Sequence, residues 1–122
     1  MKFLWTTIYV RNLDESVSFY SDLLGLQVIK RFPAGPDTEI AFMGNRTDNE
    51  TLVELMADSK KGITSFGESI SIGFAVDSVD AMLDIVKRKD IPVNSGPFET
   101  PAFRFFCIKD PNGLNVQFFQ QK

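Results

Sequence analysis

The chain has no histidine and only one cysteine among its 122 residues. Without histidine it cannot form a Ser-His or Cys-His nucleophile pair, nor the imidazole-containing sites that hold most catalytic transition metals. The single Cys107 cannot form an intrachain disulfide, and its neighbours Phe106 and Ile108 indicate a small buried hydrophobe. Nothing in this composition indicates an oxidising compartment, so we expect a cytoplasmic protein.

Long apolar runs and blocks of like charge are also missing. The apolar stretch between Lys2 and Arg11 is too short for a signal peptide or a membrane span, so no membrane partner is expected. The net charge is −3 and the sequence pI is near 4.9. Such a surface does not attract a polyanion, so nucleic acid is not an expected partner either. The length and the 43% of hydrophobic residues predict one globular domain over residues 1–122.

A short motif occurs twice in the chain. The residues I-Y-V-R-N-L-D from Ile8 to Asp14 return as F-A-V-D-S-V-D from Phe74 to Asp80, an offset of 66 positions. The elements around the motif repeat as well, which indicates an internal duplication.

Each half is predicted to contain a strand, a helix and three further strands. The first helix begins after Asn12, an expected N-cap with Glu15 three residues later, and it ends at Gly25. Ser78 is the expected N-cap of the second helix. The predicted strands are 3–10, 27–32, 38–43, 51–56, 69–76, a weaker one that begins at 91–93 and is interrupted by Gly96 and Pro97, 103–108 and 114–119.

Two motifs carry a resemblance to a known family. The motif N-L-D-E-S-x-x-F-Y-x-x-L-L-G from Asn12 to Gly25 resembles the signature helix of the glyoxalase/bleomycin resistance protein/dioxygenase superfamily, also called the vicinal oxygen chelate superfamily. The D-P-N-G turn from Asp110 to Gly113 resembles its second signature. The resemblance implies an α+β fold. In it, two βαβββ modules, here 1–60 and 66–122, form a mixed, barrel-like curved sheet with the helices outside and a cavity within.

Alternation along the strands predicts which residues line that cavity. On the first strand Leu4, Ile8 and Val10 form the side that packs under the helix, so the intervening residues face the other way. The same reasoning on the later strands completes the candidate ligand-binding set, which is Trp5, Thr7, Glu54, Ser71, Gln117 and Phe119.

The resemblance implies that Trp5, Glu54, Ser71 and Gln117 occupy the four metal-ligand positions of the family's metalloenzymes. Indole offers only an N–H donor, and a serine hydroxyl is a poor ligand. Glu54 and, more weakly, Gln117 are the donors that remain, which falls short of a catalytic metal site. The sequence therefore predicts neither a bound metal nor another cofactor.

Two of these residues also have purely structural interpretations. Trp5 either fills space in the core or forms a wall on which a flat ligand stacks. Glu54 either reaches solvent or an internal partner such as Arg104, or it recognises a cationic or hydrogen-bond-donating ligand, or it acts as a general base. Arg104 itself either meets an anionic group or faces solvent, and we favour solvent.

The leading hypothesis is a metal-independent member of the superfamily that binds a small organic molecule, aromatic or amphipathic, with drug or toxin sequestration as one version. Alternatives are a metal-dependent lyase, isomerase or dioxygenase, an enzyme using Glu54 as base, and a non-catalytic interaction domain whose cavity has collapsed around Trp5. The sequence does not decide whether the protein is an enzyme. Family assembly and open sheet edges predict a homodimer.

Overall fold

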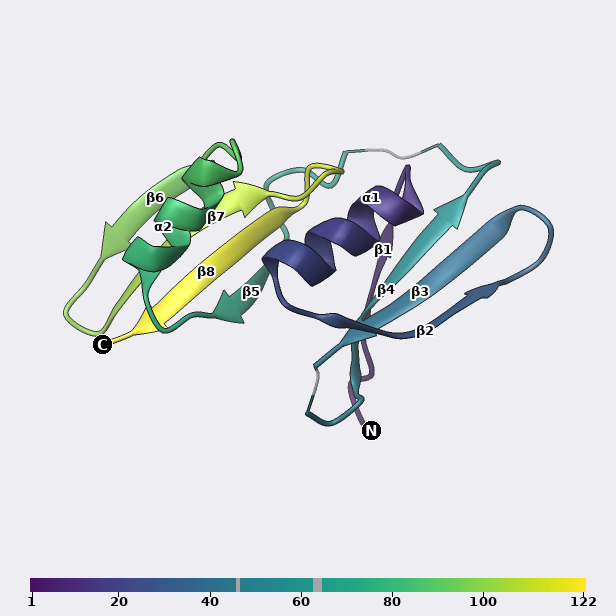
Figure 1. Cartoon of the computed structure of the whole chain (residues 1–122), viewed down its shortest axis with the longest axis horizontal. Helices are drawn as coiled ribbons and strands as arrows, with labels where there is room; N and C mark the ends of the chain where they lie inside the picture. The colour runs from purple at the N-terminus through teal and green to yellow at the C-terminus, as the bar shows by residue number, and fades with distance from the viewer. Residues whose placement is uncertain (46, 63–64) are drawn as a thin grey trace. The chain divides into compact units, whose positions relative to one another are not determined.

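Two units with the same order of elements, Met1–Thr64 and Ser65–Lys122, make up the chain in the computed structural model, which describes residues 1–45, 47–62 and 65–122 (Figure 1). The first unit contains β1 (Thr6–Tyr9), α1 (Leu13–Ser18), the π-helical turn η1 (Phe19–Leu23), β2 (Gln27–Pro33), β3 (Thr38–Gly44) and β4 (Thr51–Asp58). The second contains β5 (Ser71–Ala75), α2 (Val79–Arg88), β6 (Ser95–Glu99), β7 (Phe103–Lys109) and β8 (Asn115–Gln121).

The strand order is also the same in both units, β1-β4-β3-β2 in the first and β5-β8-β7-β6 in the second. In each sheet the first strand runs parallel to the last, and the other neighbours are antiparallel. The register repeats too, because Thr7 pairs with Glu54 and Gly73 pairs with Gln117. The predicted α+β fold with two βαβββ modules and mixed sheets is confirmed. That the two sheets enclose one cavity stays a prediction.

Local signals in the sequence set the helix ends. The Asn12 side chain accepts a hydrogen bond from the Glu15 N–H at 2.9 Å, and the Ser78 hydroxyl accepts one from the Ala81 N–H at 3.1 Å. Both predicted N-caps are therefore confirmed. The first helix continues as η1 and ends where Gly25 takes a positive φ of 72°. This is the conformation that glycine adopts at little cost.

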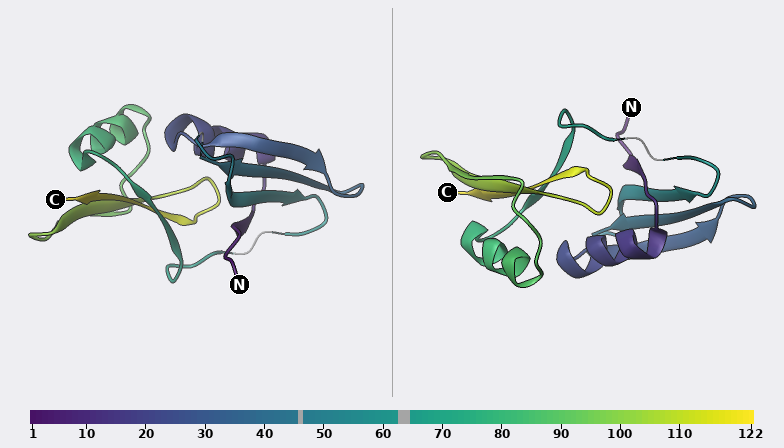
Figure 2. Two further views of the ribbon diagram at one scale, coloured as in Figure 1. Left: turned by 90° about the horizontal axis from the view of Figure 1, so that it is seen from below. Right: turned by 90° about the horizontal axis from the view of Figure 1, so that it is seen from above.

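The core of the first unit lies between α1 and one face of its sheet (Figure 2). Tyr20, Leu55 and Ile8 are almost completely buried there. Ile8 and Val10 thus lie in the core as expected, but the expectation for Leu4 is wrong, since Leu4 is 57% exposed. The reason is that β1 begins at Thr6, so Leu4 precedes the ladder that β1 forms with β4.

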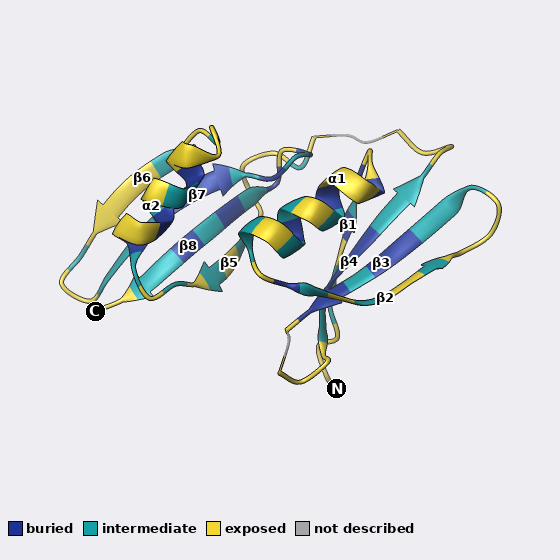
Figure 3. Cartoon of the chain, viewed as in Figure 1, coloured by how far each residue is buried: buried dark blue, intermediate teal, exposed yellow. Residues whose placement is uncertain are grey.

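The second unit has a corresponding core between α2 and the centre of its sheet. The buried residues of α2 are Val79, Met82 and Val86. The dark blue segments of β7 and β8 in Figure 3 supply the opposing side chains. These buried side chains are Phe106, Ile108, Val116 and Phe118.

The prediction that a weaker strand begins at 91–93 is wrong, because the strand begins at Ser95. The strand is β6, and it contains the Gly96 and Pro97 that were expected to interrupt it. Gly96 has a φ of 89°, and a Cβ atom there would lie 3.0 Å from the Phe105 carbonyl oxygen. Glycine therefore lets β6 approach β7 closely around an irregularity in the register between Ser95 and Phe98.

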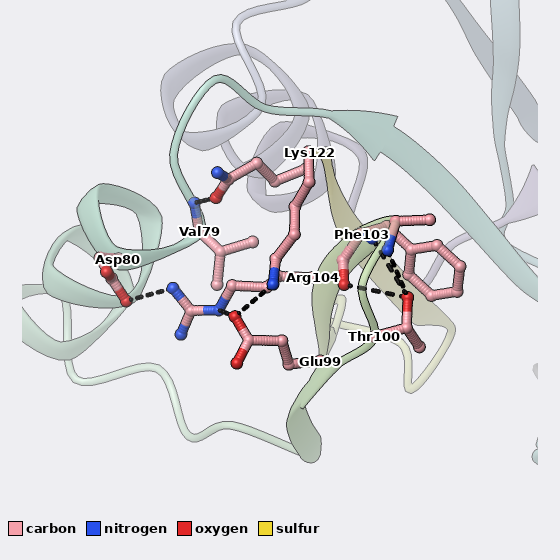
Figure 4. Close-up of polar contacts among 9 residues, drawn as sticks. Val79, Asp80, Glu99, Thr100, Phe103, Arg104 and Lys122 are labelled. Carbon is pink, nitrogen blue, oxygen red and sulfur yellow. Dashed lines mark hydrogen bonds and ion pairs between the residues drawn. The ribbon is translucent and has the colours of Figure 1, made fainter.

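Ion pairs tie the first turn of α2 to its sheet (Figure 4). Arg104 Nη1 lies 2.9 Å from Asp80 Oδ1, and Arg104 Nε lies 3.6 Å from Glu99 Oε1. Lys122 Nζ also contacts Glu99 Oε1, at 2.7 Å. The expectation that Arg104 faces solvent is wrong, because its side chain is only 23% exposed and is paired with carboxylates on α2 and β6.

The first unit has a similar arrangement around Arg31. This arginine lies 2.8 Å from Asp14 and 3.0 Å from Glu39. Hydrogen bonds to Glu39 and Asp14 raise the pKa of Arg31 above its usual value, so its charge is secure. Asp14 and Asp80 are equivalent in the repeat, so both helices are held at the same position.

Within the described residues, no helix combines the length and apolar character that crossing a membrane would require.

Candidate functional site

Each sheet has one face packed against its helix and a second face, which we call the open face. On the open face of the first sheet, Thr7 and Glu54 are register partners on β1 and β4. The Thr7 hydroxyl donates a hydrogen bond to Glu54 Oε1 at 2.6 Å. Because side chains alternate along a strand, Trp5 lies on this face as well, two residues before Thr7. The structure thus brings together the three candidate residues of the first module.

Aromatic side chains lie on the same face as this carboxylate. Phe42 on β3 is the other register partner of Glu54, and its ring centroid lies 5.1 Å from that of Trp5, with the ring planes tilted by 40°. Phe32 on β2 packs edge-on against Phe42 at 5.3 Å. Trp5 is half-buried, so its ring is supported by Phe42 and still partly reachable. Such an aromatic group offers a flat, polarisable surface to a ligand.

Glu54 is 9% exposed, which is unusual for a carboxylate. The ion pairs formed within residues 1–45, 47–62 and 65–122 do not include Glu54, so the internal partner Arg104 is not used. Among the described residues, its hydrogen-bond donor is Thr7, which contacts Oε1. No fully buried side-chain oxygen in the described part of the chain lacks a partner, so Oε2 keeps access to solvent.

Two lysines already lie on aromatic rings of this face. The Lys61 ammonium lies 4.0 Å from the centroid of the Tyr9 ring. The Lys30 ammonium lies 5.0 Å from the centroid of the Phe32 ring. Both distances are within the range in which a cation is attracted by the electrons of a ring face.

The open face of the second sheet holds Ser71, Gln117 and Phe119. Gln117 lies opposite Gly73, and a Cβ atom added at Gly73 would lie 3.4 Å from Gln117 Oε1. The amide therefore extends over the space that the missing side chain leaves on β5. Ser71, two residues earlier on β5, is exposed and pairs in register with Asn115 rather than with Gln117.

Phe119 belongs to a cluster of phenylalanine rings on the same face. Its ring centroid lies 5.0 Å from that of Phe103, which in turn lies 5.9 Å from Phe105. Phe98 on β6 extends the cluster, 5.1 Å from Phe105. These rings are partly exposed, in contrast to Phe106 and Phe118 on the helix side, and they form an apolar surface beside Gln117.

The donor atoms at the positions implied by the family's metalloenzymes do not suit a transition metal. In the first unit Trp5 has no lone pair to donate, and Glu54 Oε1 is already held by Thr7. In the second unit the groups are a hydroxyl and a neutral amide. No three His, Cys, Asp or Glu side chains come together in the part of the chain that the structure describes. A firm site needs three or four good ligands, so the residues do not fit such an ion.

Two surface hollows lie away from these residues. One of about 440 Å³ adjoins the turn between β2 and β3, where Pro33, Pro36 and Asp58 line it. The other, of about 420 Å³, lies between α2 and the segment that follows it, beside Leu83, Ile91 and Val93. Neither contains a candidate residue, and neither brings together groups with an evident chemical task. The open faces therefore remain the better candidates.

Sequence reasoning missed the aromatic neighbour of Trp5. Phe42 supports Trp5 from a strand almost forty positions away. Alternation along β3 gives the only sequence signal for Phe42, since it places Ile40 and Phe42 on one side. To use this signal one must also know that β3 lies beside β4, which the sequence alone does not show.

Comparison with known proteins gives concordant results. A family model described as the glyoxalase/bleomycin resistance protein/dioxygenase superfamily matches residues 2–118. A lactoylglutathione lyase of Neisseria meningitidis is 30% identical over 129 residues, spanning 100% of this chain and 92% of its own. Glyoxalase I of Leishmania major has a TM-score of 0.81 at 24% identity, spanning 98% of this chain and 86% of its own. TnmS3, an antibiotic binding protein from Streptomyces, has a TM-score of 0.73 at 17% identity, spanning 100% and 98%.

Proposed function

Because the chain belongs to the glyoxalase/bleomycin resistance protein/dioxygenase superfamily, we propose that it is a metal-independent member that binds a small planar organic molecule. In the first unit Trp5, Thr7 and Glu54 on the open face would contact such a molecule. Ser71, Gln117 and Phe119 are the candidate contacts on the open face of the second unit. The donor set described above supports binding rather than metal chemistry.

The observation that carries the proposal is the environment of Trp5. The resemblance implies that Trp5 stands where the family's metalloenzymes have a ligand. Its ring rests on Phe42, on the face that holds a carboxylate with an accessible oxygen. An aromatic surface next to a small number of polar groups is typical of small-molecule sites, where the rings supply contact area and the polar groups fix orientation. The partly exposed rings around Phe119 offer a second surface of this kind.

The antibiotic binding protein TnmS3 shares the fold over the whole chain, which supports a binding role as one use of this scaffold. Fold alone does not establish a function, so the proposal depends on the residues of the two open faces. Sequestration of a toxic compound is the version of the proposal that needs no reaction at all.

A metal-dependent lyase is the second candidate. It is favoured by the 30% identity to a protein named lactoylglutathione lyase and by the presence of Glu54 at one of the implied ligand positions. Formation of lactoylglutathione can be assayed with nickel, zinc, cobalt and manganese in turn. Turnover that depends on one of these metals and is lost in Glu54→Ala would replace the binding proposal with this one.

The direct test is isothermal titration calorimetry with three planar probes of similar size. These are 1-methylquinolin-4-one, which is neutral, N-methylquinolinium chloride, which is cationic, and quinoline-4-carboxylate, which is anionic. At least one probe should bind the wild-type protein saturably, and Trp5→Leu should abolish that binding. Phe19→Leu is the matched control, because Phe19 is a half-buried aromatic residue that contacts Tyr20 in the helical segment of the same unit.

The outcomes separate cleanly. Binding that is lost in Trp5→Leu and retained in Phe19→Leu supports the proposal. Saturable binding that is equal in all three proteins shows that Trp5 is not part of the site. No binding of any probe contradicts a site for planar molecules.

We also propose that the protein is a homodimer. One edge strand of each sheet exposes an apolar side chain, with Val28 on β2 43% exposed and Phe98 on β6 48% exposed. Edges of this kind are commonly covered by a partner. Sedimentation that shows only a species of about 14 kDa at micromolar concentration would contradict the dimer.

A further inference from the structure

We infer that the group of the ligand that meets Glu54 carries a positive charge, so that the protein selects planar organic cations over neutral or anionic molecules of the same shape. This inference rests on the proposed function and specifies the chemical class of its ligand. Three features of the first open face support it. These are an accessible carboxylate oxygen, the aromatic rings near it, and the two lysine ammonium groups that already lie over rings of this face.

The carboxylate is short of partners. Thr7 satisfies Oε1, whereas Oε2 has no hydrogen-bond donor among the described residues and stays accessible. Removing a charged group from water is unfavourable unless another group compensates for the lost hydration. A ligand that covers Glu54 must supply this compensation, and a positively charged group does so better than an uncharged one, because opposite charges attract strongly at close range.

The rings beside the carboxylate favour the same kind of ligand. Phe42 is the register partner of Glu54 and lies against the Trp5 ring, and the faces of aromatic rings attract cations. The protein provides an internal example, since the ammonium groups of Lys61 and Lys30 lie over Tyr9 and Phe32 on the same face. A carboxylate flanked by aromatic rings therefore has two attractive terms for a cation and only one for a neutral aromatic molecule.

Anionic molecules are disfavoured by the same features. Glu54 would repel an anion at close range, and the net charge of −3 adds a weak repulsion at longer range. Lys30 and Lys61 are exposed, and neither forms an ion pair with Glu54 among the described residues.

The experiment compares the affinities of the three quinoline probes for the wild-type protein, Glu54→Gln and Glu15→Gln. Glu54→Gln keeps the shape and removes the charge. Glu15→Gln makes the same change of net charge at an exposed position in the first turn of α1. Circular dichroism confirms that each variant is folded.

On the wild-type protein, N-methylquinolinium should bind about tenfold or more tightly than 1-methylquinolin-4-one, and quinoline-4-carboxylate should bind weakest. Glu54→Gln should remove the preference for the cation and leave the neutral probe nearly unchanged, while Glu15→Gln should keep the wild-type order.

Equal binding of the cationic and neutral probes to the wild-type protein overturns the inference and leaves the proposed function standing. The same holds if the preference for the cation survives in Glu54→Gln or disappears in Glu15→Gln. Absence of binding by every probe contradicts the proposed function itself, so the two failures are distinguishable. The order of the probes on the wild-type protein needs no variant, so the test remains decisive even if Glu54→Gln does not fold.

Discussion

Leu55→Ala tests the face assignment on which the candidate site depends. Leu55 and Glu54 are neighbours on β4, so their side chains lie on opposite faces of the sheet. Leu55 is fully buried on the helix side, between its register partners Ile8 and Ala41, which are 1% and 0% exposed. If this assignment is right, Glu54 is on the open face and can meet a ligand.

The magnitude follows from the burial. Leu→Ala removes three carbon atoms, and at about 0.8 kcal/mol for each buried methylene this amounts to about 2.4 kcal/mol. A residual cavity of roughly 40 Å³ adds about 1 kcal/mol, because the packed partners can collapse only partly. The expected loss is about 3–4 kcal/mol in the free energy of unfolding, measured by urea denaturation followed by circular dichroism.

Met56→Ala is the matched control. Met56 follows Leu55 on β4, is similar in volume, and lies half-buried on the open face. Its truncation should lower the free energy of unfolding by only about 1 kcal/mol. A loss below about 1 kcal/mol for Leu55→Ala, or an equal loss for both variants, would refute the assignment and place Glu54 against the helix.

Three further predictions concern local structure. Ser78→Ala removes the acceptor for the Ala81 N–H and should lower the free energy of unfolding by about 1 kcal/mol in urea denaturation. Gly113 has a φ of 89°, and a Cβ atom added there would meet no other atom. Gly113→Ala should therefore lower the free energy of unfolding by about 1–2 kcal/mol through backbone strain alone. The hydrogen bond with Lys122 lowers the pKa of Glu99 below its ordinary 4.5. The contribution of this ionised carboxylate to stability is therefore present above pH 4.5 and disappears as the pH falls through the lowered pKa. Thermal unfolding should therefore show Glu99→Gln to be less stable than the wild type at neutral pH and equal to it in strong acid.

The sequence was sufficient where the signal is local. Asn12 and Ser78 cap their helices through donors three residues away, and Gly25 ends the first helix through its own φ. The repeated motif predicted two modules with the same topology, because a duplicated pattern of strands and helix leaves few other ways to bury its apolar faces.

The sequence was insufficient where neighbours are distant along the chain. Gly96 and Pro97 read as a strand break, yet the close approach of β6 to β7 requires a glycine at that point. Arg104 was expected in solvent, because the positions of Asp80 and Glu99 around it depend on tertiary packing. The support of Trp5 by Phe42 likewise depends on β3 lying beside β4.

The metal content of the purified protein tests the central claim most directly. Elemental analysis after expression in medium supplemented with nickel, zinc, cobalt, iron and manganese should find each of them well below one atom per chain. None of these ions should raise the unfolding temperature specifically, because an ion that binds the native state must raise it by mass action. About one transition-metal atom per chain, lost in Glu54→Ala, would contradict the account and identify the protein as a metal-dependent member of its superfamily.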